Sequence, residues 1–194
     1  MKNQDIYIQM FSIHGLIRSH NLELGRDADT GGQITYVLEL GKTLSKLEQI
    51  RQVDLFTRLI VDKSVSEEYS VPIEPVNDKF RIVRIQCGGK KYIRKELLWP
   101  HLSEFIDKSL KFIKKQNLIP DLVHGHYADG GLVAMKLSEI LGVPFVFTGH
   151  SLGRPKMRKL SDKGMTDEEI RKKYKIDIRI KNEERILANT DLIV

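Results

Sequence analysis

Residues 121–151 read DLVHGHYADGGLVAMKLSEILGVPFVFTGHS, and this stretch decides the predicted fold. Leu122–His124 is predicted as a short strand, a helix follows Gly130 and Gly131 to about Leu141, and Phe145–Thr148 is a second apolar strand. A helix between two short apolar strands is typical of the crossover that joins parallel neighbours in a sheet. Such crossovers are right-handed in nearly all proteins, so this stretch also predicts the hand of the fold.

The same alternation of strand and helix extends over the rest of the chain. Short apolar or β-branched runs predict strands at Ile6–Ile13, Val53–Leu59, Phe80–Ile85 and Asp191–Val194. Apolar residues at helical spacing predict helices from Gln33 to about Glu48, over Lys95–Gln116 with a break near Pro100, and from Thr166 through Glu184 to Leu187. Residues 61–79 contain two prolines and are expected to form a surface connection. We therefore predict an α/β fold, a Rossmann-like doubly wound parallel sheet, in one domain over residues 1–194.

The composition is typical of a soluble globular protein. The 194 residues are 41% hydrophobic and 30% charged, and the apolar runs are too short to cross a bilayer. The single cysteine, Cys87, excludes an internal disulfide and a multi-cysteine metal site. Because no secretory signal is recognisable after Met1, a cytoplasmic protein is expected.

Basic residues are concentrated in the middle of the chain. The net charge is +6, and residues 79–115 hold 11 basic and 3 acidic side chains. This surplus favours partners that carry phosphate, although a solvated helix face can have the same composition. Aromatic residues make up only 7% of the chain and no base-stacking module is recognisable, which argues against nucleic acid as a partner.

Ligands of a doubly wound sheet bind beyond the carboxyl ends of its strands. Four connections are therefore candidates: His14–Gln33, Gly88–Lys95, Gly125–Gly131 and Gly149–Lys156. The first ends in Asp-Thr-Gly-Gly-Gln at residues 29–33, where paired glycines would let a ligand approach and the following helix would offer free N–H groups to an anion. A tight turn without a ligand is the alternative, and the dinucleotide fingerprint Gly-x-Gly-x-x-Gly does not follow the first strand.

Two of these connections carry histidines. His124 and His126 lie two residues apart at a strand end and hence on one face, and Asp129 could complete a metal site with them. The wall of a substrate site is the simpler interpretation, so we expect no metal. His150 and Ser151 could form a nucleophilic pair, but adjacent residues rarely have the geometry for a mutual hydrogen bond. A histidine that faces a sugar, beside a serine that holds an anion, is the alternative.

Two lysines lie beside glycine-flanked loops at the predicted ligand edge, Lys95 after Gly88-Gly89 and Lys156 after Gly153. Cations from separate loops are what a phosphate monoester site requires. Exposed surface charges are the alternative for the other basic residues of these loops.

Four segments together resemble the sucrose-phosphate synthase family. They are HGLIRSHNLELGRDADTGGQITYVLELGKTLS at His14–Ser45, KELLWPHL at Lys95–Leu102, HGHYADGG at His124–Gly131 and TGHSLGRPKM at Thr148–Met157. The resemblance covers nearly the whole chain and implies the amino-terminal half of a GT-B fold, in which two Rossmann-like domains face each other across a cleft. The family transfers glucose from UDP-glucose to fructose 6-phosphate with retention of configuration, giving sucrose 6-phosphate and UDP.

The resemblance also implies roles for individual residues. Gly31, Gly32 and Gln33 match the loop that contacts the acceptor sugar and the donor phosphates, and His150 matches the catalytic-site histidine near the transferred glucose. The positions that bind fructose 6-phosphate, chiefly its phosphate, are matched by Lys95, Tyr127, Ser151, Lys156 and Arg179. The resemblance implies no tightly bound cofactor and no metal, with UDP-glucose as the donor substrate.

The chain departs from the family in three respects. Ile178 stands where the first of two adjacent arginines is usual, which predicts weaker binding of the acceptor phosphate, and Pro155 replaces a residue that is often polar. The carboxy-terminal nucleotide-sugar domain is absent from these 194 residues, so we expect an acceptor-domain fragment that is inactive alone. Sucrose synthase, another GT-B transferase and a non-catalytic sugar-phosphate-binding module are the alternatives.

Overall fold

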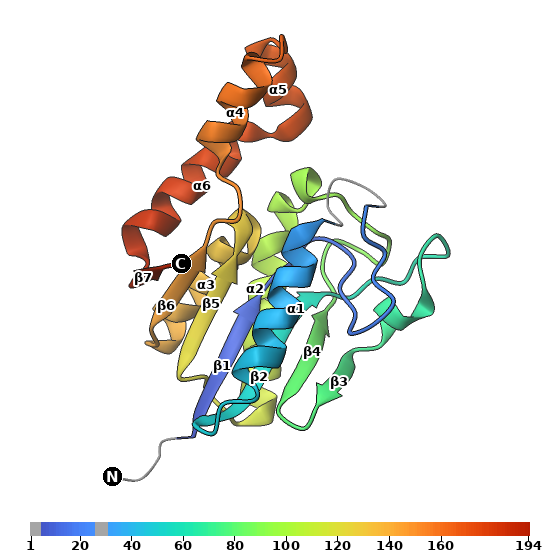
Figure 1. Cartoon of the computed structure of the whole chain (residues 1–194), viewed down its shortest axis with the longest axis vertical. Coiled ribbons are helices and arrows are strands. Elements are labelled where there is room, and N and C mark those ends of the chain that lie inside the picture. Colours follow the sequence, from blue (N-terminus) through green and yellow to red (C-terminus); the bar gives the residue numbers. More distant parts are fainter. Residues whose placement is uncertain (1–4, 26–30) are drawn as a thin grey trace.

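A seven-stranded sheet forms the centre of the molecule, shown by a computed structural model that describes residues 5–25 and 31–194 (Figure 1). The strand order is β3-β4-β2-β1-β5-β6-β7. The strands are β1 (Ile6–Phe11), β2 (Ile50–Arg58), β3 (Ile73–Asn77), β4 (Phe80–Ile85), β5 (Leu122–His126), β6 (Phe145–Thr148) and β7 (Leu192–Ile193). All neighbours pair in parallel except β3 and β4, which are antiparallel. The predicted Rossmann-like fold is confirmed, with one antiparallel strand added at an edge.

Helices cover both faces of the sheet. Helix α1 (Gly32–Leu44) packs on one face, where Ile8 and Met10 of β1 point. Helices α2 (Leu102–Gln116) and α3 (Tyr127–Leu141) pack on the other face, which receives Phe11 of the same strand. Successive side chains of a strand point to opposite faces, so a strand that is apolar throughout is buried between two helical layers. Each face of the sheet therefore carries a hydrophobic core, and the sheet separates the two.

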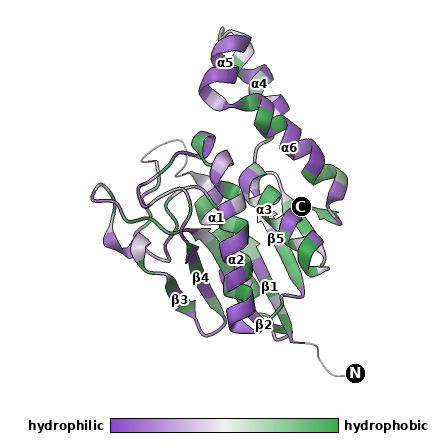
Figure 2. Ribbon diagram, turned by 180° about the vertical axis from the view of Figure 1, so that it is seen from behind, coloured by the Kyte–Doolittle hydropathy of each residue, from purple (hydrophilic) through white to green (hydrophobic). Residues whose placement is uncertain are grey.

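The last three helices are α4 (Gly153–Ser161), α5 (Asp167–Tyr174) and α6 (Ile176–Asn189). Figure 1 shows α4 and α5 standing beyond the carboxyl edge of the sheet, while α6 runs back beside α3. Figure 2 shows that α5 is largely hydrophilic. No helix in the described ranges is both long and apolar enough to span a bilayer.

The helices after β6 differ from the prediction in two ways. Thr166 and Glu169 form a capping box, as the Thr-Asp-Glu-Glu sequence predicts. The single helix predicted from Thr166 to Leu187 is wrong, because Lys175 adopts a left-handed conformation (φ 47°) that ends α5 before α6 begins. Helix α4 was not predicted. Its Pro155 lies in the first helical turn, where proline removes no intrahelical hydrogen bond.

Residues 61–79, predicted as a surface connection, contain the short 3₁₀ helix η1 (Glu67–Ser70) and strand β3. Pro75 is tolerated in β3 because this strand lies at the edge of the sheet. The predicted break near Pro100 is confirmed: two 3₁₀ turns, η2 (Lys95–Leu97) and η3 (Trp99–His101), precede α2.

Helix α3 begins earlier than predicted, so Gly130 and Gly131 lie inside it rather than before it. A Cβ atom on Gly130 would lie only 2.2 Å from the backbone oxygen of Phe11. Glycine is therefore required there because α3 crosses very close to β1.

Candidate functional site

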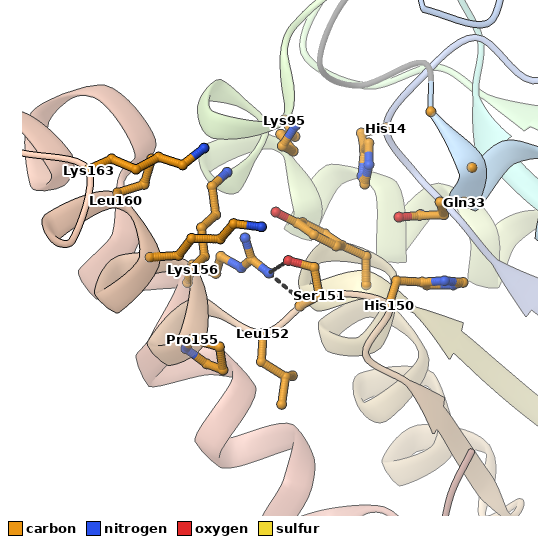
Figure 3. A pocket seen from close by; sticks show the side chains of 15 residues that line it. His14, Gln33, Lys95, His150, Ser151, Leu152, Pro155, Lys156, Leu160 and Lys163 are labelled. Carbon is orange, nitrogen blue, oxygen red and sulfur yellow. Dashed lines mark hydrogen bonds between the residues drawn. The ribbon is translucent and has the colours of Figure 1, made fainter. Parts of the chain in front are cut away.

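A cavity of about 610 Å³ lies at the carboxyl edge of the sheet, where β1, β5 and β6 end and α1 begins. Strands β2 and β5 lie on opposite sides of β1, so this is the point where the strand order changes direction, as expected for a ligand site of such a sheet. The cavity is lined by all nine predicted site residues: Gly31, Gly32, Gln33, Lys95, Tyr127, His150, Ser151, Lys156 and Arg179 (Figure 3). The structure therefore brings these residues together, while their roles stay predictions.

The start of α1 is open toward the cavity. Gly31 occupies the N-cap position without a side-chain hydrogen bond to the first turn. A Cβ atom on Gly31 or Gly32 would meet no described atom within 4 Å, so packing does not require glycine at either position. The first N–H groups of a helix have no intrahelical acceptor and attract anions. The Asp29 and Thr30 of the predicted motif lie outside the described residues.

Gln33 is held by the residue that follows β1. Its side-chain Nε2 donates a hydrogen bond to Oγ of buried Ser12 at 3.0 Å. The amide is thereby oriented, and Figure 3 shows its oxygen pointing into the pocket. Gln33 is therefore positioned to accept a hydrogen bond from a hydroxyl group of a ligand.

Arg179 is a buried cation whose contacts join three segments. Its Nε donates to Glu183 at 2.7 Å, and its Nη2 donates to the backbone oxygen of Ser151 and to Ser151 Oγ at 3.4 Å. The other oxygen of Glu183 accepts the N–H of Gly153 at 2.6 Å. One carboxylate therefore fixes both the guanidinium group and the start of α4.

Tyr127 lies beside this arginine at the start of α3. Its ring centroid is 4.3 Å from the guanidinium carbon of Arg179, within cation–π distance. Burial raises the pKa of the Tyr127 hydroxyl, so the group stays protonated and can donate a hydrogen bond. Its backbone φ of +63° is uncommon for a non-glycine residue and is held by the surrounding structure.

Four lysines also line the cavity. Lys95 comes from η2, is buried, and its Nζ lies 4.0 Å from Glu96. Lys156 of α4 lies over the ring of Tyr174, with Nζ 4.3 Å from the centroid. Figure 3 shows Lys163 reaching in from the α4 side. Neither Lys163 nor Lys159 forms an ion pair with any residue that the structure describes.

Sequence reasoning missed Lys159 and Lys163. Lys159 lies three residues after Lys156 on the same face of α4, and Lys163 lies in the turn just beyond the end of that helix. The spacing was visible in the sequence, but it has meaning only once residues 153–161 are recognised as helical. Ile178, which stands in place of a family arginine, is exposed and is not among the lining residues.

The histidines form no metal site. His124 Nε2 lies 2.8 Å from Thr148 Oγ1, and Asp129 Oδ2 lies 2.8 Å from His14 Nδ1 instead of facing the two histidines. Within residues 5–25 and 31–194 no group of three or more potential ligands is close enough to hold a metal ion. The metal interpretation of His124, His126 and Asp129 therefore gains no support.

His150 does not pair with Ser151. Its Nε2 lies 3.2 Å from Nδ1 of His126, whereas Ser151 Oγ contacts Arg179. Burial, and then the nearby His14, lower the pKa of His150 to about 4, so the imidazole is neutral at neutral pH. Among the residues that the structure describes, no base is hydrogen-bonded to Ser151, which argues against a serine nucleophile.

His14 is a further lining residue that sequence reasoning did not single out. It is buried, its Nδ1 is bonded to Asp129, and its ring meets Tyr127 edge-on at 4.7 Å between centroids. The second Asp129 oxygen accepts the N–H of Gly130 at 2.7 Å. A carboxylate that holds Nδ1 fixes the orientation of the ring and leaves Nε2 for other partners. The feature of the sequence that could have identified His14 is its position just after the first predicted strand.

The fold and the cavity define a Rossmann-like domain with a cation-rich ligand site at its switch point. The family described as the sucrose synthase first GT-B domain matches residues 4–194, and the chain belongs to this family. The prediction of the amino-terminal half of a GT-B fold is thereby confirmed.

The resemblance to sucrose-phosphate synthases is confirmed by named relatives. The chain is 43% identical to sucrose-phosphate synthase of Zea mays and 42% identical to probable sucrose-phosphate synthase 2 of Arabidopsis thaliana, each over 100% of the chain. It spans only 20% and 21% of their lengths. The solved sucrose-phosphate synthase of Thermosynechococcus elongatus matches 97% of this chain and 41% of its own, with a TM-score of 0.75 and 27% identity.

Proposed function

We propose that the cavity binds fructose 6-phosphate and that the chain is the acceptor domain of a sucrose-phosphate synthase. The observation that carries this proposal is the convergence of Lys95, Lys156 and Arg179, from three separate segments, on one cavity at the carboxyl edge of the sheet. A phosphate monoester is doubly charged and is held best by several fixed cations. The names of relatives at 42–43% identity support the choice of sugar phosphate.

Polar groups beside the cations are suited to the sugar. The Tyr127 hydroxyl can donate, the oriented Gln33 oxygen can accept, and Ser151 can do both. A site that hydrogen-bonds each hydroxyl discriminates strongly against analogues that lack one. We propose that these groups orient fructose while the cations bind its phosphate.

Glucose transfer is proposed for a longer protein in which a carboxy-terminal domain supplies UDP-glucose. Retaining transfer passes through an oxocarbenium-like state while negative charge grows on the departing UDP. The open start of α1 at Gly31 and Gly32 would stabilise that charge with preorganised N–H groups. His150, neutral at neutral pH, would contact the transferred sugar without adding a charge. We propose that this chemistry needs no tightly bound cofactor and takes place in the cytoplasm.

Calorimetric titration of the chain tests the binding proposal. We expect fructose 6-phosphate to bind and fructose to bind about 10–100-fold more weakly, because charge-assisted hydrogen bonds contribute about 1.5–3 kcal/mol. No glucose transfer is expected when UDP-glucose is added to this chain alone.

Two lysine variants make that test specific. Lys156→Ala should weaken fructose 6-phosphate binding about tenfold and leave fructose binding unchanged. Lys172→Ala removes the same charge from an exposed position of α5 that does not line the cavity, and it should leave both affinities unchanged. Equal affinity for fructose and its phosphate, or equal effects of the two variants, would show that the cavity is not a phosphate site.

A further inference from the structure

Three histidines form a connected group that runs from the cavity into the core. His150 lines the cavity, and its Nε2 lies 3.2 Å from Nδ1 of His126, the last residue of β5. The His126 ring lies against the His124 ring, with 4.1 Å between centroids. His124 is in turn held by Thr148 through a contact of 2.8 Å. The contact between His126 and His150 therefore connects the cavity wall to this buried group.

His150 occupies a backbone conformation that needs support. Its φ is +52°, in the left-handed region that costs a non-glycine residue energy unless the surrounding structure holds it. The ring of Tyr36 packs edge-on against the His150 ring at 5.0 Å between centroids. His126 supplies the polar contact to the same ring.

His126 is fully buried and has one unsatisfied ring nitrogen. Its exposed fraction is 0%, and its Nε2 has no hydrogen-bond partner among the described residues. Burial, and then the neighbouring His124 and His150, lower its pKa well below the ordinary value, and the pKa of His150 is lowered to about 4. Both rings are therefore neutral at neutral pH, and each carries one proton.

Only one of the two nitrogens in the contact can carry a proton. If His150 donated from Nε2, the proton of His126 would have to sit on its own Nε2, as a buried N–H with no acceptor. If His126 donates from Nδ1, its Nε2 is instead a buried lone pair without a donor. Unpaired buried N–H groups are rarer in proteins than undersatisfied acceptors, so the second arrangement is favoured.

We propose that His126 is a positioning residue for His150, donating its Nδ1–H to His150 Nε2 and thereby fixing the His150 ring with its own proton on Nδ1. Nε2 of His150 is then occupied and does not serve as a base toward a ligand, so the ring offers only its Nδ1–H as a donor. The role of this arrangement in catalysis rests on the proposed function, whereas the hydrogen bond between His126 and His150 does not depend on it.

Long-range ¹H–¹⁵N correlation spectra of the ¹⁵N-labelled chain near neutral pH test the proposal, because protonated and unprotonated ring nitrogens differ in shift. We expect His126 and His150 both to carry their proton on Nδ1. In His126→Asn, the side-chain amide nitrogen replaces Nδ1 as the donor, so His150 should keep its tautomer. In His126→Leu the donor is lost, and the proton of His150 should move to Nε2 in a measurable share of molecules.

His124→Leu is the matched control, since it removes another buried histidine of the same strand, one whose ring nitrogen contacts Thr148 rather than His150. It should leave the His150 shifts unchanged. If a leucine variant does not fold, the wild-type and His126→Asn spectra decide the matter. A proton on Nε2 of His150 in the wild type, or the same His150 spectrum in His126→Leu as in His126→Asn, would overturn the proposal. Calorimetry on the same samples reports fructose 6-phosphate binding separately, so the two proposals can fail independently.

Discussion

Two Gly-Gly pairs, one inside α3 and one at the start of α1, are glycine for different reasons. Gly130 and Gly131 inside α3 are packed: a Cβ atom would lie 2.2 Å from the Phe11 backbone oxygen in one case and 2.6 Å from the Phe147 ring in the other. Gly31 and Gly32 at the start of α1 face open space. The first pair permits α3 to pack closely on the sheet, whereas the second keeps the cavity accessible. Similar sequence patterns thus serve packing in one region and, we propose, ligand binding in the other.

Gly130→Ala should have the largest effect, on stability. The added methyl group meets backbone rather than a flexible side chain, so either α3 or β1 must shift. We expect the free energy of unfolding to fall by about 3 kcal/mol or more, measured by urea denaturation, at the upper end of typical overpacking costs. An unchanged unfolding midpoint would show that α3 does not cross β1 this closely.

Acid should destabilise the folded chain by protonating buried histidines, His124 above all. The pKa of His124 is about 4 in the folded chain, lowered from 6.5 by burial and then by His150. The unfolded chain takes up this proton near pH 6.5 but the folded chain only near pH 4, so the contribution is complete above pH 6.5 and is lost as the pH falls to 4. We expect His124 to account for about 1–3 kcal/mol of the loss.

The measurement is the pH dependence of the urea midpoint in the wild type and in His124→Gln. The glutamine amide does not titrate and can keep a contact with Thr148, so the variant should lose less stability between pH 6.5 and 4. Parallel curves for the two proteins would mean that His124 is not buried in its neutral form.

Gly32→Ala is the direct counterpart of Gly130→Ala and should separate binding from stability. The methyl group meets no described atom within 4 Å, so the free energy of unfolding should change by less than about 1 kcal/mol. It would enter the cavity beside the first N–H groups of α1, where loss of one charge-assisted hydrogen bond costs about 1.5–3 kcal/mol. We expect calorimetry to show roughly tenfold weaker fructose 6-phosphate binding. Unchanged affinity would show that the start of α1 does not contact the ligand.

The smallest effect is expected from the two exposed lysines that line the cavity, Lys159 of α4 and Lys163 just beyond it. Lys159→Ala with Lys163→Ala should weaken fructose 6-phosphate binding a few-fold and reduce its dependence on salt, because exposed charges contribute about 0.2–1 kcal/mol each. The matched control is Lys172→Ala with Lys181→Ala, two exposed lysines that do not line the cavity. Titration with fructose 6-phosphate at two salt concentrations should distinguish the two double variants. Identical affinities and salt dependences in both would mean that net charge alone attracts the ligand.

Much of the fold was predictable because its central strands are apolar throughout and its crossover helices have clear periodicity. The bounds of β4 and β6 agree with the prediction at both ends. The errors have local causes. Strand β3 contains Pro75 and helix α4 contains Pro155, so neither element was predicted. Lys175 ends a helix by adopting a left-handed conformation that its residue type does not predict.

The site was predictable as a set of residues but not as a connected structure. The resemblance brought together nine residues that the structure places around one cavity. Sequence could not show that Glu183 accepts the N–H of Gly153, that Asp129 holds His14 or that His126 contacts His150, because each pair is brought together by folding rather than by a motif. A single sequence does not indicate which buried side chains will contact each other in this way.

Mapping of the ligand by NMR tests the central claim most directly. Backbone ¹H–¹⁵N spectra of the chain, recorded during titration with fructose 6-phosphate, should show the largest shifts at Gly32, Gln33, Ser151 and Lys156, and little change at Gly142 at the far end of α3. Shifts centred instead on the separate cavity near Ile60, Ser66 and Lys91, or no shifts at millimolar ligand, would contradict the account.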